Sequence, residues 1–266
     1  MLSVKIDQAN AEVKMWKFPA GECGVKLQFP DINCNPEKLT ISWLWESNDE
    51  MMALAQIVDA IANKYGDKIY KVLEIPYFPY SRQDRRCSAG EGHALKMFAK
   101  FINSFNFDKV ITKDAHSYVL EAVVENIYNI EHHVCSGGIS NNYDILIAPD
   151  AGASKKIYKM LNNGQQVIVA NKTRDIDGKI IGMDVDVSLV DKGGKILVAD
   201  DLCDNGGTFI ALGEILREKL GASNKIDLYV THGFFGKGVD VLLKMYDNVF
   251  VHNLMNKSVK NKVVTV

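Results

Sequence analysis

The chain has 266 residues, of which 47% are hydrophobic, and carries a formal net charge of −2 at pH 7. This length suits one large or two ordinary domains with a substantial core, and the small net charge excludes a general electrostatic attraction to nucleic acid. The five cysteines are scattered without a CxxC pair, which favours reduced thiols and a cytoplasmic location. No apolar run reaches membrane-spanning length, so we expect no membrane partner. Because the net charge is small, we also expect no nucleic-acid partner.

The first third of the chain predicts a sheet with a covering helix. Residues 13–29 contain a turn followed by alternating apolar positions, which indicates a hairpin. Residues 39–45 are an apolar run of strand length, and the amphipathic segment after them predicts a helix that ends at Gly66. Trp43 and Trp45 are expected to pack in the core or at an interface, because no polar residues converge on them.

An arginine-rich loop follows the next predicted strand, Tyr70–Ile75. The prolines of the PYFPY segment end regular strand pairing, and Arg82, Arg85 and Arg86 come directly after it. Guanidinium groups bind phosphate oxygens in pairs, so this loop is a candidate site for a phosphate chain. The alternative is a solvated cluster of surface charges.

A helix of about residues 93–105 leads to another strand, which runs into Asp114 and His116. An Asp and a His two residues apart at a strand end can reach one ligand, and His116 could hold Mg²⁺-bound phosphate or a water. The alternative is a hydrogen-bonded structural histidine. His132 and His133 have no such context and are expected in a loop.

The glycine- and asparagine-rich segment 136–142 marks the predicted boundary between domains 1–140 and 141–266. The second domain opens with another strand, loop and helix, whose turn carries Asp150 and Gly152. Next come a strand and a polar hairpin, with Lys172 and Arg174 near its base and DIDGK at its tip. Taken alone, this pair of cations would be solvated surface charges.

The most informative stretch is residues 195–221, which predicts a strand, an acidic and glycine-rich loop, and a helix. Gly206 and Gly207 allow a close backbone approach or a positive φ, and Thr208 can cap a helix whose N-terminal amides favour a phosphate. The neighbouring acids suit sugar hydroxyls or hydrated Mg²⁺. The loop therefore predicts a pocket for a phosphorylated sugar, with a plain surface turn as the alternative.

Several of these segments resemble one known family in colinear order, from about residue 17 to residue 266. VADDLCDNGGT resembles the phosphoribosyl-diphosphate (PRPP) loop of type I phosphoribosyltransferases, and IPYFPYSRQDRR resembles the more specific PYFxYxRQDR signature of ribose-phosphate diphosphokinases, or PRPP synthetases. TKDAHS, PDAGASKK, the Lys-Thr-Arg pair and THGFFGKG are similar to further segments of these synthetases. The chain is identified as a short, divergent member.

The resemblance implies an α/β fold of two phosphoribosyltransferase-like βα domains, each a mostly parallel sheet flanked by helices. It implies a kinase-type transferase that moves the β,γ-diphosphate of ATP to the anomeric hydroxyl of ribose 5-phosphate, giving PRPP and AMP. ATP and a 5-phosphorylated ribose would be the substrates, with Mg²⁺ as cofactor. A homo-oligomer, either a dimer or a hexamer, is expected.

The resemblance also assigns roles to residues. The catalytic pair would be Lys172 and Arg174, the diphosphate loop Asp150, Ala151 and Gly152, and the metal ligands His116 and Asp150. ATP would be bound by Phe18, Glu22, Arg82, Gln83, Asp84, Arg86 and His116. The ribose 5-phosphate would be bound by Asp200, Asp201, Asp204, Asn205, Gly206, Gly207 and Thr208.

Two positions depart from the family pattern and leave alternatives open. Ala20 removes an expected carboxylate from the adenine-contacting FxDGE loop, and Asn205 replaces the usual Thr of the 5-phosphate loop. The second change could admit a substituted acceptor such as ADP-ribose, which would give ADP-ribose pyrophosphate for NAD synthesis. Further alternatives are a phosphoribosyltransferase that consumes PRPP and a non-catalytic nucleotide-sensing subunit.

Overall fold

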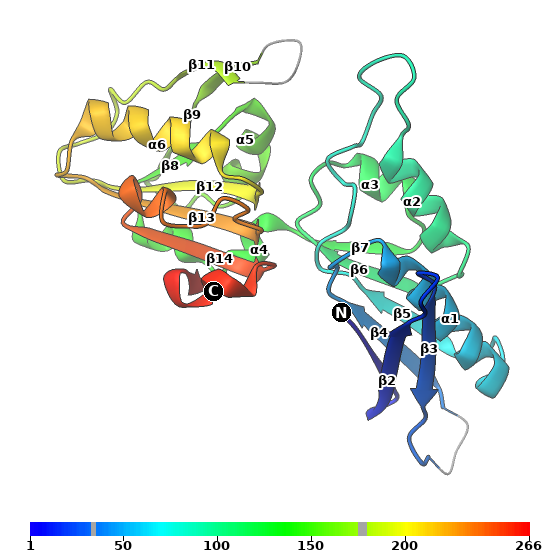
Figure 1. The fold of residues 1–266 in the computed structure, drawn as a ribbon. Coiled ribbons are helices and arrows are strands. Elements are labelled where there is room, and N and C mark those ends of the chain that lie inside the picture. Colours follow the sequence, from blue (N-terminus) through cyan, green and yellow to red (C-terminus); the bar gives the residue numbers. More distant parts are fainter. Residues whose placement is uncertain (33–35, 175–179) are drawn as a thin grey trace. The chain divides into compact units, whose positions relative to one another are not determined.

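The structure, a computed structural model, describes residues 1–32, 36–174 and 180–266, and the side chains of Arg174 and Ile180 lie outside that description. Two compact units are present, Met1–Ile130 and Glu131–Val266 (Figure 1). The predicted division lay at 140/141. The intervening residues belong with the second unit, because the buried Ser140 hydroxyl donates to the Met160 carbonyl at 2.8 Å.

The first unit is built on one mixed sheet of seven strands in the order β3-β2-β1-β4-β5-β6-β7. Its strands are β1 (Leu2–Ile6), β2 (Ala9–Lys17), β3 (Cys23–Gln28), β4 (Lys38–Trp43), β5 (Tyr70–Glu74), β6 (Lys109–Lys113) and β7 (Ile127–Ile130). Strands β4 to β7 are parallel, whereas β1, β2 and β3 extend the sheet with antiparallel pairs. The hairpin predicted over 13–29 is the β2–β3 pair. Strand β1 was not predicted.

The helices of the first unit are α1 (Asp49–Tyr65), α2 (Ala94–Asn103) and α3 (Val119–Val123). Their apolar faces join the strands in one core, which confirms the prediction for Trp43, a fully buried side chain with 0% exposure. Its indole nitrogen donates to Glu50 at 2.9 Å, so the buried polar atoms of both residues are paired. Trp45 packs against this core and is partly buried.

The second unit contains a sheet of six parallel strands in the order β15-β14-β13-β12-β8-β9. These strands are β8 (Ile145–Ala148), β9 (Gln166–Val169), β12 (Lys195–Cys203), β13 (Lys225–Gly233), β14 (Asn248–Leu254) and β15 (Val264–Thr265). A separate antiparallel ribbon is formed by β10 (Asn171–Arg174) and β11 (Ile180–Asp184). The helices are α4 (His132–Cys135), α5 (Ala151–Tyr158) and α6 (Gly207–Leu220), with 3-10 turns η1 (Ile139–Asn142), η2 (Leu242–Lys244) and η3 (Lys257–Lys262).

Helices cover both faces of this parallel sheet. Ile145 and Ile147 of β8 belong to a core that includes Leu212 of α6, whereas Leu146 lies in a second core with Ile157 of α5. Alternate residues of a strand therefore point to different helices, as expected for a parallel sheet buried on both sides. This arrangement confirms the predicted α/β fold. In such sheets ligands bind at the carboxyl ends of the strands.

The expectation for His132 and His133 was wrong, because both lie in the short helix α4 rather than in a loop. The helix packs against α5, and the His132 imidazole contacts the Thr231 hydroxyl at 3.1 Å. His132 is buried, with 2% exposure, so tertiary packing within the second unit determines its conformation.

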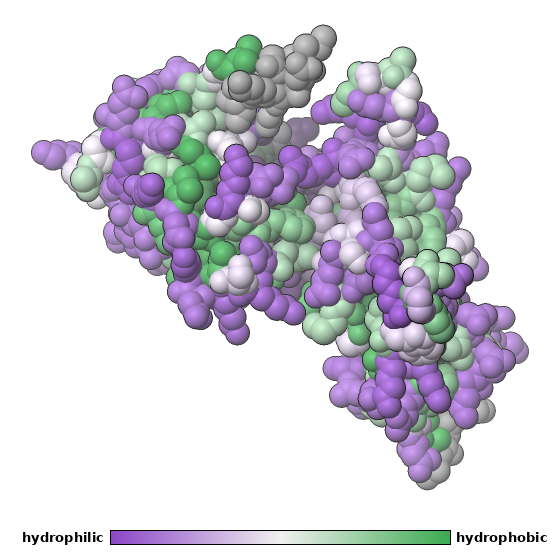
Figure 2. All heavy atoms as spheres, viewed as in Figure 1, coloured by the Kyte–Doolittle hydropathy of each residue, from purple (hydrophilic) through white to green (hydrophobic). Residues whose placement is uncertain are grey.

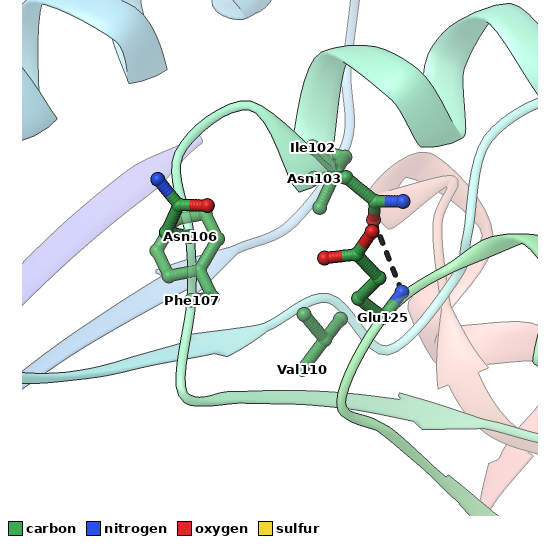
Figure 3. A pocket seen from close by; sticks show the side chains of 6 residues that line it. All are labelled: Ile102, Asn103, Asn106, Phe107, Val110 and Glu125. Carbon is green, nitrogen blue, oxygen red and sulfur yellow. Dashed lines mark hydrogen bonds between the residues drawn. The ribbon is translucent and has the colours of Figure 1, made fainter.

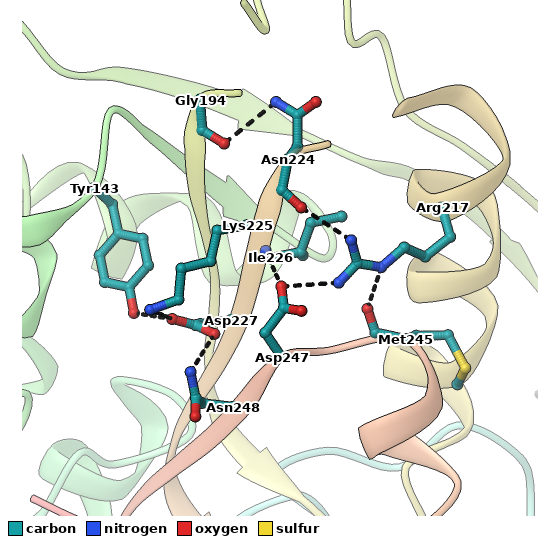
Figure 4. Close-up of polar contacts among 10 residues, drawn as sticks. All are labelled: Tyr143, Gly194, Arg217, Asn224, Lys225, Ile226, Asp227, Met245, Asp247 and Asn248. Atoms are coloured by element: carbon teal, nitrogen blue, oxygen red, sulfur yellow. Dashed lines mark hydrogen bonds and ion pairs between the residues drawn. The ribbon is translucent and has the colours of Figure 1, made fainter. Parts of the chain in front are cut away.

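The amino ends of the second unit's strands are held by a polar network (Figure 4). The buried Asp227 carboxylate accepts from the Tyr143 hydroxyl at 2.5 Å and from the Asn248 amide at 3.0 Å. Arg217 binds Asp247 at 2.9 Å and the Met245 carbonyl at 2.6 Å. These groups satisfy one another, so we assign this edge a structural role.

A small pocket in the first unit also lies away from the carboxyl ends of its strands (Figure 3). It is lined by Ile102, Asn103, Asn106, Phe107, Val110 and Glu125. These residues precede or begin β6 and β7, and the backbone amide of Glu125 donates to the Asn103 side chain at 3.1 Å. The pocket has room for about one water molecule and does not suit a nucleotide.

The visible face of each unit carries hydrophilic side chains interspersed with apolar ones (Figure 2). In the part of the chain that the structure describes, every helix is too short or too polar to span a bilayer. Among the described residues, Cys23, Cys87, Cys135 and Cys203 are not in disulfides.

Candidate active site

Asp150 occupies the turn between β8 and α5, at the carboxyl end of the strand. Its side chain caps α5 by accepting from the Ala153 amide at 3.1 Å. It also accepts a hydrogen bond from the Lys172 ammonium group, so the predicted diphosphate loop and one predicted catalytic residue are in direct contact. Burial alone would raise the pKa of Asp150, but Lys172 and the amides of Ala153 and Gly152 outweigh it and lower the pKa below its usual value.

Lys172 lies on the ribbon that follows β9, next to β8 in the sheet. Its side chain is only 11% exposed, whereas Thr173 beside it is exposed. The ribbon pairs Lys172 with Met183, and its register shifts between Thr173 and Arg174. The Arg174 side chain and the predicted hairpin tip, residues 175–179, lie outside the described residues. The role of Arg174 therefore stays a prediction.

The acid pair lies at the end of β12, the strand beside β8. The prediction ended this strand at Asp200, but β12 continues to Cys203 because β13 pairs with it as far as Gly233. Burial, and then the charge of the hydrogen-bonded Asp201 carboxyl group, raise the pKa of Asp200 well above its usual value. Adjacent acids in this environment favour a partner that donates hydrogen bonds, such as sugar hydroxyls, or a cation that neutralises their charge.

Lys156 is a further member of the site that the sequence assignment omitted. This residue of α5 places its ammonium nitrogen 3.5 Å from a carboxylate oxygen of Asp201, which is 5% exposed. The pair links the helix after β8 to the end of β12. The available signal was its position in the helix that directly follows the Asp150 turn, about 100° around the helix from solvent-exposed Lys155.

The predicted 5-phosphate loop connects β12 to α6. Asp204, Asn205 and Gly207 are exposed, and Gly206 has a left-handed φ of 79°. The expectation that Thr208 caps the helix was wrong: the capping residue is Gly206, and Thr208 lies in the first turn. Because no side chain caps this end, the first amides of α6 remain available to an anion.

The loop after β13 supports the predicted 5-phosphate loop. After β13, the amides of Phe234 and Gly236 donate to the carbonyls of Cys203 and Asp204, each at 2.8 Å. The buried Phe235 ring packs so closely on Gly233 that a Cβ there would lie 2.2 Å from it. The THGFFGKG segment therefore holds the 5-phosphate loop in place.

In the first unit, Phe18 and Glu22 form the turn that closes the β2–β3 hairpin. The Phe18 amide donates to the Glu22 carbonyl at 2.8 Å, and Gly21 adopts a φ of 92°. Phe18 is 45% exposed and makes an edge contact with Trp16. An exposed aromatic ring of this kind can stack on a planar base.

The arginine-rich loop follows β5 and starts from a rigid aromatic anchor. Tyr80 has a positive φ of 62°, its ring packs on Trp45 and Phe98, and its hydroxyl donates to Asn48. The loop residues Arg82 and Gln83 that follow are exposed.

The rest of this loop is stabilised locally. Arg86 donates to the Glu91 carbonyl at 3.1 Å, and the Glu91 carboxylate accepts from the Cys87 amide at 2.6 Å. The Cys87 amide, the Ser88 hydroxyl and the Ser88 amide lower the pKa of Glu91. Asp84 is partly buried and lies 3.9 Å from Arg85. The cluster is thus a partly ordered loop rather than a row of unconnected surface charges.

His116 lies just beyond β6, the strand next to β5, and its side chain is exposed. Asp114 is buried, with 3% exposure and a positive φ of 45°, so these two residues differ in their access to a ligand. The arginine-rich loop and His116 thus follow neighbouring parallel strands at the same edge of the sheet.

The two predicted metal ligands belong to different units, His116 to the first and Asp150 to the second. Among residues 1–32, 36–174 and 180–266, no group of three His, Cys, Asp or Glu side chains could hold a metal ion. The donor chemistry nevertheless fits a cation that arrives with its own phosphate ligands, because Asp150 is a partly exposed carboxylate beside the acid pair.

Comparisons with known proteins agree on one family. Residues 3–105 match the N-terminal domain of ribose phosphate pyrophosphokinase. A ribose-phosphate pyrophosphokinase of Cereibacter sphaeroides is 32% identical over 70% of this chain and 56% of its own length. One from Pyrococcus abyssi is 30% identical over 86% of this chain and 78% of its own length.

A solved structure shares the fold over nearly the whole chain. Phosphoribosylpyrophosphate synthetase from Mycobacterium smegmatis matches with a TM-score of 0.73 and 22% identity, covering 97% of this chain and 85% of that protein.

Proposed function

The chain belongs to the ribose-phosphate pyrophosphokinase family, and from this membership we propose that it transfers the β,γ-diphosphate of ATP to the anomeric hydroxyl of ribose 5-phosphate. The products are PRPP and AMP. One observation carries the proposal: β8, β9 and β12 are neighbours in one parallel sheet, and each leads into a predicted part of the site. The diphosphate loop follows β8, the Lys172 ribbon follows β9, and the acidic phosphate loop lies at the end of β12.

The loop between β12 and α6 binds the acceptor in this proposal. The free amides at the start of α6 and the Gly206–Gly207 turn receive the 5-phosphate, and Thr208 adds a hydroxyl donor. Asp200 and Asp201 accept from the ribose hydroxyls, which supply hydrogen-bond donors to two adjacent carboxyl groups. Asp204 lies at the rim of the same loop.

The transfer step needs positioning and positive charge. The anomeric hydroxyl oxygen attacks the β-phosphorus of ATP and releases its proton to solvent, the bond from that phosphorus to the α-phosphate bridging oxygen breaks, and AMP leaves with the bridging oxygen. Lys172 and Arg174 stabilise the charge on the transferring oxygens, while Ala151 and Gly152 present small, exposed surfaces to the diphosphate. Mg²⁺ bound with ATP would neutralise phosphate charge; Asp150 is the candidate ligand in the second unit and His116 the candidate ligand in the first.

The first unit binds ATP in this proposal. Arg82, Gln83 and Arg86 contact the nucleotide from the arginine-rich loop, and Asp84 lies within the same loop. Phe18 and Glu22 contribute an aromatic face and a carboxylate to adenine recognition. A phosphoribosyltransferase that consumes PRPP would leave this exposed arginine loop without a role, so we favour the diphosphokinase.

Purified protein tests the proposal directly. Mg-ATP is supplied with ribose 5-phosphate or with ADP-ribose in parallel reactions, and each product is identified by mass. PRPP and AMP from ribose 5-phosphate are expected. Reaction with ADP-ribose alone would keep the chemistry but assign a substituted acceptor, a result that the exposed Asn205 would explain. Base-dependent release of diphosphate from PRPP, without AMP formation from ATP, would contradict the proposal.

Location and assembly are part of the same proposal. The described cysteines, none of them in a disulfide, suit a reducing cytoplasm, where nucleotide precursors are made. We expect a homo-oligomer, and light scattering of the purified chain distinguishes a dimer from a hexamer.

A further inference from the structure

The Asn205 side chain lies directly over Gly236, a residue of the supporting loop. A Cβ built on Gly236 would lie 2.5 Å from the Asn205 side-chain oxygen and 3.5 Å from its Cγ. Real Cβ atoms do not approach other atoms to 2.5 Å, so Asn205 in this position and any side chain at 236 exclude each other.

The backbone does not explain the glycine. Gly236 is not among the described glycines with a positive φ, whereas its neighbour Gly238 has a φ of 80°. An alanine could therefore adopt the conformation at 236 without strain. What a side chain would disturb is the Asn205 amide, whereas the Asp204 carbonyl oxygen, at 3.8 Å, would lie at an ordinary van der Waals distance.

Gly236 also has a fixed relation to the loop it supports. Its amide donates to the Asp204 carbonyl at 2.8 Å, and the adjacent Phe235 is buried with 1% exposure. The backbone at 236 is thus held against the 5-phosphate loop and cannot retreat easily from a larger side chain. A clash here would be relieved by movement of exposed Asn205.

We propose that Gly236 is a positioning residue for the acceptor site, which acts by leaving the space that the Asn205 side chain fills. Residues 205 and 236 then form one steric pair that sets the shape of the 5-phosphate loop and hence the affinity for the phosphorylated end of the acceptor. This proposal rests on the proposed function, because it assigns the same loop to the 5-phosphate.

The full-length variant Gly236→Ala tests the proposal, with Asn205→Thr and the double variant as its partners. We expect Gly236→Ala to raise the KM for ribose 5-phosphate about 10-fold while kcat and the KM for ATP stay within about twofold, because ATP is assigned to other loops. Threonine at 205 is shorter, so the double variant should recover the KM of Asn205→Thr alone.

Calorimetric titration of the same four proteins with ribose 5-phosphate, in the absence of ATP, gives a readout that does not depend on turnover. A parent protein that binds ribose 5-phosphate but forms no AMP would contradict the proposed function and leave the steric pair testable by affinity. An unchanged affinity in Gly236→Ala, or an equal loss in the single and double variants, would overturn the inference. If Gly236→Ala shows no native melting transition, the double variant Gly236→Ala/Asn205→Thr is compared with Asn205→Thr alone. The inference still requires these two proteins to have equal affinity for ribose 5-phosphate.

Discussion

The Lys172 ammonium group donates a hydrogen bond to the Asp150 carboxylate, which also caps helix α5. One residue comes from the loop after β8 and the other from the ribbon after β9, so the contact joins two chain segments at one edge of the sheet. It places a nearly buried cation beside the predicted diphosphate loop. Phosphoryl transfer requires positive charge at this kind of position.

Removing the proposed catalytic cations should affect rate far more than binding. Lys172→Ala or Arg174→Ala is expected to lower kcat by about 10³-fold or more, while ATP affinity stays within a few fold, because in our proposal these groups act mainly in the transition state. Steady-state kinetics and a separate ATP titration measure the two effects. Lys192→Ala, at an exposed position, is the matched control. Equal losses of ATP affinity and rate would sink the catalytic assignment.

Asp150→Asn separates the cap from the charge. Asparagine caps a helix about as well as aspartate, so the cap itself should change the free energy of unfolding by less than about 1 kcal/mol, and any larger loss measures the ion pair with Lys172. The variant loses the anionic partner of Lys172 and the proposed Mg²⁺ ligand, so we expect kcat to fall by about 10²-fold or more. Urea unfolding and turnover are measured on the same preparation. A variant with normal turnover would remove Asp150 from the mechanism.

Asn205→Thr restores the residue that the family pattern has in this loop. We expect the ratio of kcat/KM for ribose 5-phosphate to that for ADP-ribose to rise, because the threonine hydroxyl and shorter side chain suit a terminal phosphate. Both acceptors are assayed with saturating Mg-ATP. If the ratio is unchanged, residue 205 does not select the acceptor.

Cys203 should resist alkylation at mildly alkaline pH. Burial, and then the charges of Asp204 and Asp200, raise the pKa of its thiol to about 12, and the side chain is 1% exposed. The raised pKa means that the fold favours the neutral thiol. The contribution of this thiol to stability is therefore present below about pH 9 and is lost as the pH approaches 12. Iodoacetamide at pH 8 should label exposed Cys87 and spare Cys203, as read by peptide mass mapping. Comparable labelling of Cys87 and Cys203 would contradict the burial of Cys203 at the end of β12.

Tyr143→Phe tests the structural network at the opposite edge of the sheet. The variant loses the hydrogen bond to buried Asp227, so the free energy of unfolding at pH 7 should fall by about 1–3 kcal/mol. Burial and Asp227 raise the pKa of Tyr143, so this contribution is present below pH of about 10 and diminishes at higher pH. Activity per folded molecule should not change. A kinetic defect without a stability defect would contradict the structural role.

The sequence predicted the parts of the site that depend on local chain order. Asp150 and Lys172 each follow an apolar strand, Asp200 lies near the carboxyl end of β12, and strand ends of a parallel sheet meet at one edge. The extension of β12 to Cys203 could not be predicted, because it depends on pairing with β13.

Contacts between distant segments could not be predicted from the sequence either. The ion pair of Lys156 with Asp201 and the fit of Asn205 over Gly236 arise only after the sheet is assembled. The cap of α6 depends only on neighbouring residues, yet the sequence did not predict that it is Gly206 rather than Thr208. The cap has a positive φ, which either Gly206 or Gly207 could have adopted.

The most direct test of the central claim follows the phosphorus atoms. ATP labelled at its β-phosphorus is incubated with Mg²⁺, ribose 5-phosphate and the full chain, and the products are separated and identified by mass. Our account predicts unlabelled AMP and a label in the diphosphate of PRPP. Labelled ADP, or a sugar product that carries a single new phosphate, would contradict diphosphate transfer.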